Sequence, residues 1–307
     1  MILTVTANPL LDRYLRVGEI QRGTIHRGES VDEWVGGKGV NVSRAVLALG
    51  GDTLATGFLG GYTGERIREL LDAENIAHEF ISIKTVTRQG LSLWQPDAKL
   101  TAFYDPPAPV SKQEITAFIR RFPHWLDRAD FCVIAGSMPG PEHADFYARL
   151  IAMCKTQAVP VLLDTYGTPL QHSLPAGADF IKVNREEVLH TFPEVPIDQR
   201  MDVFVRKARN SGTAHILITD GEGPCRLFSH DETVEFQPPA VHERNALGSG
   251  DCTAAGIACA LLDGMFVERA VVFGLAAGAA NAETLAPAAI TPERVHQLAR
   301  EVTLMVR

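Results

Sequence analysis

Several features are scarce in this sequence of 307 residues, and each scarcity excludes a class of protein. Only five cysteines are present and none form a C-x-x-C pair, which is typical of reduced thiols and not of a disulfide framework. Positive charge is also scarce, and the net charge of −8 opposes binding to nucleic acid, whose phosphates select basic surfaces. No apolar run reaches the length of a membrane span, and no charged-then-apolar leader follows Met1. We therefore expect a globular, cytoplasmic protein that binds neither nucleic acid nor membranes.

Apolar residues are abundant, at 46% of the sequence, and they fall into short runs that alternate with helical patterns. A chain of this length can bury a large core as one domain with an appendage, or as two smaller domains. The alternation predicts a parallel sheet covered by helices. Strands are expected at Ile2–Thr6, Phe131–Ile134, Val159–Leu163, Phe180–Val183 and His215–Thr219, and helices from Asn41 onward and near 111–122, 142–157, 198–211 and 251–264.

Segments of mixed polarity in the first third of the chain predict a second, smaller sheet. Their partial alternation is typical of strands with one solvent-facing side. They are Asp12–Val17, Thr24–Trp34, Glu79–Lys84, Gly90–Gln95 and Leu100–Tyr104. A small isolated sheet rarely buries both of its faces alone, so apolar side chains such as Trp34, Leu93 and Trp94 are candidates for contact with a second copy of the chain.

The turn Gly248-Ser249-Gly250 precedes Asp251 and a helical run of small residues. Glycines let backbone N–H groups point at an anion, and the dipole of the following helix favours negative charge. The pattern predicts a phosphate site with Asp251 beside it, where the carboxylate can accept a proton from a hydroxyl that attacks the phosphate. The alternative is that Asp251 merely begins a helix after a glycine-rich turn.

A second glycine-rich stretch, Gly36–Ser43, matches neither common phosphate-binding fingerprint. In a Walker A loop Ser or Thr follows the lysine, whereas here Gly39 follows Lys38, and no Rossmann G-x-G-x-x-G is present. The functional interpretation is close backbone approach to a small polar ligand, with Lys38 and Asn41 as donors. The alternative is a flexible loop that caps the helix at Asn41.

Polar residues follow several of the predicted strands, where ligands of parallel sheets bind. They are Asn8, Gly136-Ser137, Asp164, Asn184 and Asp220.

These motifs together resemble those of a known family. The chain carries Thr6-Ala7-Asn8-Pro9 with Asp12, then Gly36–Ser43 with Arg44-Ala45, then Lys182–Glu187, and finally Gly248–Asp251. In this order they resemble the signatures of the PfkB family of ribokinase-like carbohydrate kinases, most of all the branch with 1-phosphofructokinase and tagatose-6-phosphate kinase. The resemblance implies a ribokinase-like three-layer α/β/α sandwich with a mostly parallel central sheet and a small β-sheet lid. It implies a single domain over residues 1–307, with lid strands inserted at about 12–34 and 79–104.

For phosphoryl transfer, the resemblance implies that Asp251 is the catalytic base and that N–H groups of Gly248, Ser249 and Gly250 stabilise the transferred group. Asn184 and Glu187 would hold Mg²⁺ through water molecules, since magnesium keeps much of its hydration shell. Their alternative is a capping box at a helix start, which looks identical in sequence. The residues expected near ATP are Lys182, Asn184, Thr219, Gly221, Gly223 and Asn281.

For the sugar, the resemblance implies contacts from Asp12, Gly37, Lys38, Asn41 and Ser137, and from Arg27 and Arg88 to the sugar's own phosphate. The alternatives are a turn acid at position 12 and solvated surface charges at the two arginines. The chain also departs from its relatives. Gln89–Ser92 lacks the Asn and Lys that follow the arginine there, and Phe103–Pro107 replaces a Gly-Pro turn. Half of the expected phosphate clamp is therefore missing.

We expect an ATP- and Mg²⁺-dependent phosphotransferase, with K⁺ as a further candidate cofactor. It would phosphorylate a hydroxyl of a ketohexose phosphate of the fructose 1-phosphate or tagatose 6-phosphate class, and it would form a homodimer through the lid. The alternatives are a kinase of an unphosphorylated sugar or nucleoside, and a non-catalytic sugar sensor on the same fold.

Overall fold

The computed structural model describes residues 1–95, 100–229 and 232–305, and within them the main element is a ten-stranded sheet. Its strand order is β14-β13-β12-β11-β10-β9-β8-β1-β4-β5, and neighbours from β11 to β5 pair in parallel. The parallel strands are β1 (Ile2–Thr6), β4 (Thr53–Leu59), β5 (His78–Ser82), β8 (Phe131–Ala135), β9 (Val161–Asp164), β10 (Phe180–Asn184) and β11 (His215–Asp220). The antiparallel strands are β12 (Gly223–Ser229), β13 (Glu232–Gln237) and β14 (Thr303–Met305).

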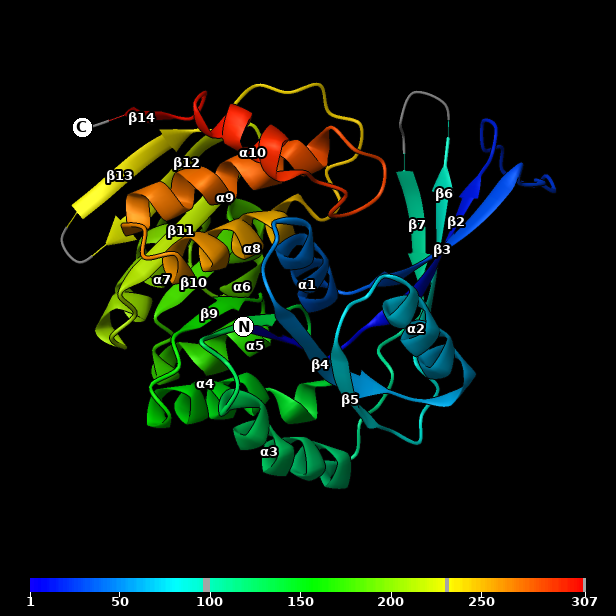
Figure 1. The fold of residues 1–307 in the computed structure, drawn as a ribbon, viewed down its shortest axis with the longest axis horizontal. Helices are drawn as coiled ribbons and strands as arrows, with labels where there is room; N and C mark the ends of the chain where they lie inside the picture. Colours follow the sequence, from blue (N-terminus) through cyan, green and yellow to red (C-terminus); the bar gives the residue numbers. More distant parts are fainter. Residues whose placement is uncertain (96–99, 230–231, 306–307) are drawn as a thin grey trace.

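The central strands are apolar along nearly their whole length because helices cover both faces of the sheet. In β8, Val133 and Ala135 face one core, whereas Cys132 and Ile134 face the other. The first core is closed by α1 (Lys38–Ala48), α8 (Ser249–Leu262), α9 (Val267–Ala282) and α10 (Pro292–Ala299). The second is closed by α3 (Lys112–Leu126), α4 (Phe146–Thr156), α5 (Thr168–Ser173), α6 (Arg185–Thr191) and α7 (Arg200–Asn210). These layers, seen in Figure 1, confirm the predicted α/β/α sandwich.

A separate four-stranded sheet, the lid, stands beside the main body in Figure 1. Its order is β3-β2-β6-β7, from β2 (Leu10–Arg16), β3 (Ser30–Gly36), β6 (Gln89–Trp94) and β7 (Leu100–Tyr104). The base of the lid packs on α2 (Gly61–Ala73), because Leu11 and Val35 share a small core with Ile67 and Leu71. The lid is therefore anchored at one end by apolar contacts.

The structure corrects the expected extent of the small sheet. The segment Glu79–Lys84 lies outside it, because β5 pairs with β4 as an edge strand of the main sheet. Partial alternation misled the prediction here, since an edge strand is also half-exposed.

The lid's tryptophans also differ from expectation. Trp34 and Trp94 are half-buried against Tyr14, with ring centroids 4.3 and 6.5 Å from that of Tyr14.

Among the described residues, no helix combines the length and the apolar character that crossing a membrane requires.

Candidate active site

A cleft of about 410 Å³ lies where the carboxyl ends of β1, β8, β9 and β10 face the lid. Of the residues predicted at strand ends, Asn8, Gly136, Ser137 and Asn184 line the cleft, whereas Asp164 and Asp220 do not. Asn8 Nδ2 donates to Ser137 Oγ across 3.0 Å. Two residues that line the cleft, Thr6 and Arg88, each have a buried side-chain atom, Oγ1 and Nε, without a hydrogen-bond partner among the described residues. Buried polar groups are rarely left unpaired, so these atoms indicate a binding site for a polar ligand.

The glycine turn adopts the conformation that the sequence predicts. Gly248 has φ 87°, a left-handed value that favours glycine, and α8 begins at Ser249. The first amides of a helix have no intrahelical acceptor, so those of Gly250 and Asp251 are available to an anion. The turn is held from behind, because Asn281 Nδ2 donates to Leu247 O at 2.9 Å and to Ser249 Oγ at 3.0 Å.

Asp251 is buried in the first turn of α8, and its Oδ2 accepts a hydrogen bond from Asn41 Nδ2 at 2.8 Å. Burial raises the pKa of Asp251 to about 6, and the charge of Asp164 adds to the rise while Lys38 and the Asn41 hydrogen bond oppose it. At neutral pH the carboxylate is therefore mostly ionised, yet it is more basic than an ordinary aspartate.

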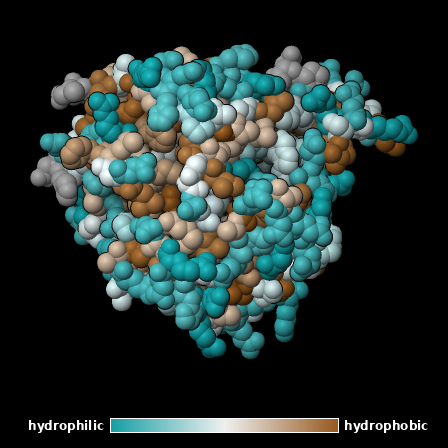
Figure 2. Space-filling view, viewed as in Figure 1, coloured by the Kyte–Doolittle hydropathy of each residue, from teal (hydrophilic) through white to brown (hydrophobic). Residues whose placement is uncertain are grey.

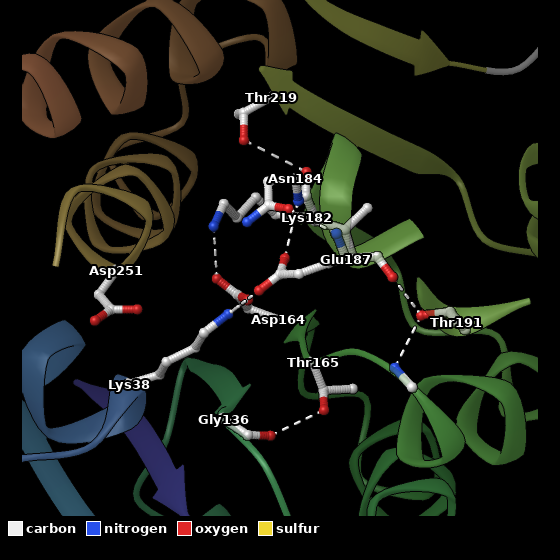
Figure 3. A network of polar contacts seen from close by, with 12 residues as sticks. Lys38, Gly136, Asp164, Thr165, Lys182, Asn184, Glu187, Thr191, Thr219 and Asp251 are labelled. Atoms are coloured by element: carbon white, nitrogen blue, oxygen red, sulfur yellow. Dashed lines mark hydrogen bonds and ion pairs between the residues drawn. The ribbon is translucent and has the colours of Figure 1, made fainter. Parts of the chain in front are cut away.

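Two lysines share one buried carboxylate beside Asp251, as Figure 3 shows. Lys38 Nζ donates to Asp164 Oδ1 at 2.7 Å, and Lys182 Nζ donates to Asp164 Oδ2 at 2.8 Å. Lys38 also donates to Glu187 Oε1 at 2.7 Å. Burial alone would favour neutral lysine, but Asp164 and Glu187 raise the pKa of Lys38 above its usual value. Burial opposes ionisation of Asp164 too, but the two ammonium groups hold its pKa below the usual value.

Asn184 and Glu187 form the capping box that was the alternative to a metal role. Asn184 Oδ1 accepts from Glu187 N at 2.8 Å, and Glu187 Oε2 accepts from Asn184 N at 2.9 Å. Both side chains nevertheless line the cleft. The described residues contain no group of three or more His, Cys, Asp or Glu side chains arranged to hold a metal ion. Any ion at this position would keep water or ligand oxygens in its coordination shell.

On the lid side, Asp12 is buried at the centre of a hydroxyl cluster. Its carboxylate accepts from Ser92 Oγ at 2.9 and 3.1 Å and also interacts with the hydroxyls of Tyr14 and Tyr104. Burial raises the pKa of Asp12 although these hydroxyls lower it. A Cβ at Gly90 would lie 2.8 Å from Asp12 Oδ1 and 2.7 Å from Tyr104 Cδ1. Gly90 lies in the stretch that departs from the family pattern, and because it has no side chain it leaves room for the hydroxyl cluster around Asp12.

The two candidate phosphate arginines have different environments. Arg88 lines the cleft, and its Nη2 donates to Asn8 O at 3.1 Å. Burial lowers the pKa of Arg88, because the protein interior disfavours the charged guanidinium. Arg27, by contrast, is exposed in the loop between β2 and β3 and does not line the cleft. Gly37 does line the cleft, with φ 126° where the lid joins α1.

A second pocket, of about 270 Å³, opens on the other side of the glycine turn. Four of the residues expected near ATP line it, namely Lys182, Asn184, Thr219 and Gly221, and its apolar wall consists of Pro238, Pro239, Val241, Leu275 and Ala279. Gly223 and Asn281 do not line it. Gly250 and Lys182 line both this pocket and the cleft, so the two cavities meet at the start of α8.

Residues 5–294 match the family described as pfkB family carbohydrate kinase. The chain belongs to this family.

Solved structures of similar fold cover almost the whole chain. Phosphofructokinase-2 from Escherichia coli in complex with potassium is 24% identical, with a TM-score of 0.87 over 97% of this chain and 98% of that one. The same enzyme in complex with fructose-6-phosphate is 24% identical, with a TM-score of 0.84 over 97% of this chain and 98% of that one. A protein of Thermotoga maritima described as a possible 1-phosphofructokinase is 22% identical, with a TM-score of 0.88 over 99% of this chain and 98% of that one. At these identities the likeness shows the fold.

Nothing in the sequence indicated the two tyrosines that line the cleft of this pfkB family kinase, and the ion pairs of Asp164 were not predicted. Tyr104 and Tyr166 line it, and Asp164 joins two cations beneath it. Asp164 was expected among the polar residues at strand ends, and it is the last residue of the buried strand β9. The tyrosines carried no signal, since an aromatic residue at a strand end is equally typical of packing. Asn281 does not line the second pocket itself, but its amide supports the glycine turn and donates to Ser249, which does line it.

Proposed function

We propose that this kinase transfers the γ-phosphoryl group of ATP to a hydroxyl of a phosphorylated ketohexose, with Asp251 as the base. One observation carries the proposal. A buried carboxylate of raised pKa lies beside the helix start at which an apolar nucleotide-sized pocket and a polar cleft meet. A donor phosphate at the turn and an acceptor hydroxyl in the cleft would both be within reach of the start of α8.

Asp251 would take the proton of the attacking hydroxyl. Its Oδ2 is engaged by Asn41, so Oδ1 remains for the acceptor. A base whose pKa of about 6 lies near the operating pH combines a high ionised fraction with useful proton affinity. General base catalysis of this kind contributes about 10²- to 10⁴-fold, and positioning of the reactants supplies much of the rest.

The start of α8 would stabilise charge on the transferred group. The free amides of Gly250 and Asp251 and the helix dipole favour an anion there. Lys182 reinforces them, since its Nζ lies 2.5 Å from where a Cβ at Gly250 would be, directly against the turn. Asp164 holds Lys182 in this position. Ser249 and Gly248 would act through the backbone of the same turn.

The oxygen-rich pair Asn184 and Glu187 fits a hydrated Mg²⁺ better than a closed metal cage, because only one carboxylate is offered. When bound with ATP, Mg²⁺ would neutralise charge on the phosphates. Glu187 is oriented by hydrogen bonds from Lys38 Nζ and from the backbone N–H of Asn184. These contacts would give Lys38 a role in ordering the metal side, whereas the sequence suggested a contact with the sugar.

The lid would select the acceptor. Asp12 would accept hydrogen bonds from sugar hydroxyls, and Asn41, Ser137 and the Gly37 backbone lie in the same cleft. Arg88, with an unpartnered Nε, is the candidate for the sugar's phosphate. The relatives support a phosphosugar, since one E. coli structure holds fructose-6-phosphate.

Two observations favour a second candidate, an unphosphorylated sugar or nucleoside. Lys38 is occupied by carboxylates, and Arg27 lies outside the cleft, which leaves Arg88 alone to hold a dianion.

A substrate panel tests these candidates. Purified protein with ATP and Mg²⁺, with and without K⁺, is incubated with fructose 1-phosphate, fructose 6-phosphate, tagatose 6-phosphate, free hexoses and nucleosides, and ADP release is measured. We expect turnover with a ketohexose phosphate. Turnover with only free sugars or nucleosides would favour the second candidate, and binding of sugar without any turnover would show a sensor.

We also propose a homodimer formed through the lid. The lid exposes Ile25, Val31 and Phe103, with exposed fractions of 89%, 49% and 62%. Large apolar side chains left exposed on a thin sheet and its loop favour an interface. Light scattering at micromolar concentration should give twice the 33.4 kDa chain mass, and a mass of one chain would contradict the proposal.

A further inference from the structure

The side-chain amide of Asn41 lies between the proposed base and an arginine outside the cleft. Its Nδ2 donates to Asp251 Oδ2 at 2.8 Å, and its Oδ1 accepts from Arg44 Nη1 at 2.9 Å. A guanidinium can only donate, so it requires the amide oxygen on its side, which leaves the NH₂ group to face Asp251. Arg44 therefore determines which end of the amide the base meets.

Arg44 is itself fixed by groups from two other elements. Its Nε and Nη2 contact the carboxylate of Glu74 at the end of α2, with an Nη2–Oε1 distance of 3.0 Å. Nη2 also donates to Val35 O of the lid strand β3 at 3.2 Å. The arginine side chain is only 17% exposed, so these contacts are largely shielded from water. A bidentate pair of this kind fixes the plane of the guanidinium.

The arrangement matters most after Asp251 has taken a proton. An unrestrained asparagine could then rotate by half a turn and accept the new O–H through its oxygen. With Oδ1 held by Arg44, Asn41 offers only N–H groups, so a proton on Oδ2 would have no acceptor there. The proton must then reside on Oδ1, the oxygen left for the substrate.

We propose that Arg44 and Glu74 are positioning residues for phosphoryl transfer, which keep Asn41 a donor to Asp251 in both protonation states of the base. The inference rests on the proposed function, because it needs Asp251 to carry the proton. Neither residue touches the cleft. Their effect passes through one amide, and this makes the inference testable apart from the identity of the base.

Other charged groups also act on Asp251 and must be separated from this effect. They are Lys38 from α1, Lys182 from β10 and Asp164 from β9. The positive charge of Arg44 could act over distance as well. A path through the amide disappears when the amide is removed, whereas a long-range charge effect remains.

The experiment is a double-mutant cycle with Arg44→Met and Asn41→Ala in the full chain, in which kcat and both KM values are measured across pH. We expect Arg44→Met to lower kcat by about tenfold or more, since it removes charge-assisted hydrogen bonds, with each KM within about threefold. The acid limb of its kcat profile should move to higher pH. In the Asn41→Ala background, Arg44→Met should change kcat by less than about twofold. Equal losses in both backgrounds would overturn the inference.

Further variants guard against misfolding and against confusion with the proposed function. Arg44→Lys keeps the charge but not the planar fork, and should fall between wild type and Arg44→Met in kcat. Glu74→Gln should lower kcat by less than Arg44→Met. The matched control is Arg66→Met, which removes an exposed arginine paired with Glu33 and Glu69 and should leave kcat unchanged. Turnover retained by Asp251→Asn would refute the role of Asp251 as the base. Additive losses of kcat in the Arg44→Met and Asn41→Ala variants would refute only this inference.

Discussion

The carboxyl edge of the main sheet and the lid differ in how completely their charged side chains are paired. At the sheet edge, Lys38, Lys182, Asp164 and Glu187 are joined by hydrogen-bonded ion pairs before any ligand arrives. On the lid side, Arg88 has a buried Nε without a hydrogen-bond partner among the described residues, and burial lowers the pKa of its guanidinium.

This difference fits the separate tasks that we propose for the two sides, phosphoryl transfer at the sheet edge and sugar binding at the lid. Phosphoryl transfer requires donors that are already oriented, because reorganisation during the reaction would add to its barrier. Internal ion pairs provide this orientation at the sheet edge. Under the proposed function, the lid side would leave part of its hydrogen-bonding capacity for the sugar, which would complete the network when it binds.

Removing the proposed base should have the largest effect. Asp251→Asn keeps the shape of the side chain but cannot accept the proton, so we expect kcat to fall by about 10²- to 10⁴-fold with the fold retained. Stopped assays of ADP release measure kcat, and circular dichroism monitors the fold. Asp263→Asn at the other end of α8 is the control and should retain full turnover. A loss below about tenfold for Asp251→Asn would contradict its role.

Breaking the sheet-edge pairs should cost stability. Asp164→Asn leaves the buried Lys182 ammonium, 2% exposed, without its carboxylate, and such a change costs about 3–5 kcal/mol. Urea unfolding measures the change in the free energy of unfolding. The exposed Asp127→Asn should stay within about 0.5 kcal/mol of wild type. If both variants are equally stable, the ion pairs do not organise this edge.

The raised pKa of Asp251 predicts opposite pH trends for stability and activity. The folded carboxyl binds its proton more tightly than the unfolded one, so its stabilising contribution is full below about pH 4 and is lost as pH rises through about 6. Relative to Asp251→Asn, wild type should therefore lose about 1–3 kcal/mol of stability between pH 4 and 8. Turnover should instead rise over the same range. A stability difference that does not vary with pH would show that Asp251 titrates normally.

On the lid, Arg88→Ala should raise KM for the phosphosugar by at least about tenfold and leave KM for ATP within about threefold. Because the Asn and Lys expected after Arg88 are missing, we expect Arg88 to contribute more here than in a relative that has them. Arg13→Ala, an exposed arginine of the same lid, is the control. An unchanged phosphosugar KM in Arg88→Ala would place the acceptor's phosphate elsewhere, or show that the acceptor carries none.

The local parts of this protein could be predicted from sequence. The turn at Gly248 and the helix after it depend on residues close together in the chain, and the Asn184–Glu187 capping box spans three positions. The parallel strands were visible as apolar runs. The edge strand β5 was misassigned because half-exposure looks alike in a lid strand and at a sheet edge.

The connections between the motifs were decided by tertiary structure alone. Lys38 and Asp164 are 126 positions apart, and Asn41 and Asp251 are 210 positions apart. Nothing in the local sequence indicates whether Lys38 meets a carboxylate or a sugar, or whether Asn41 faces a ligand or a base. Side-chain types and turns follow from short-range preferences, whereas partners depend on how distant strand ends and the lid come together.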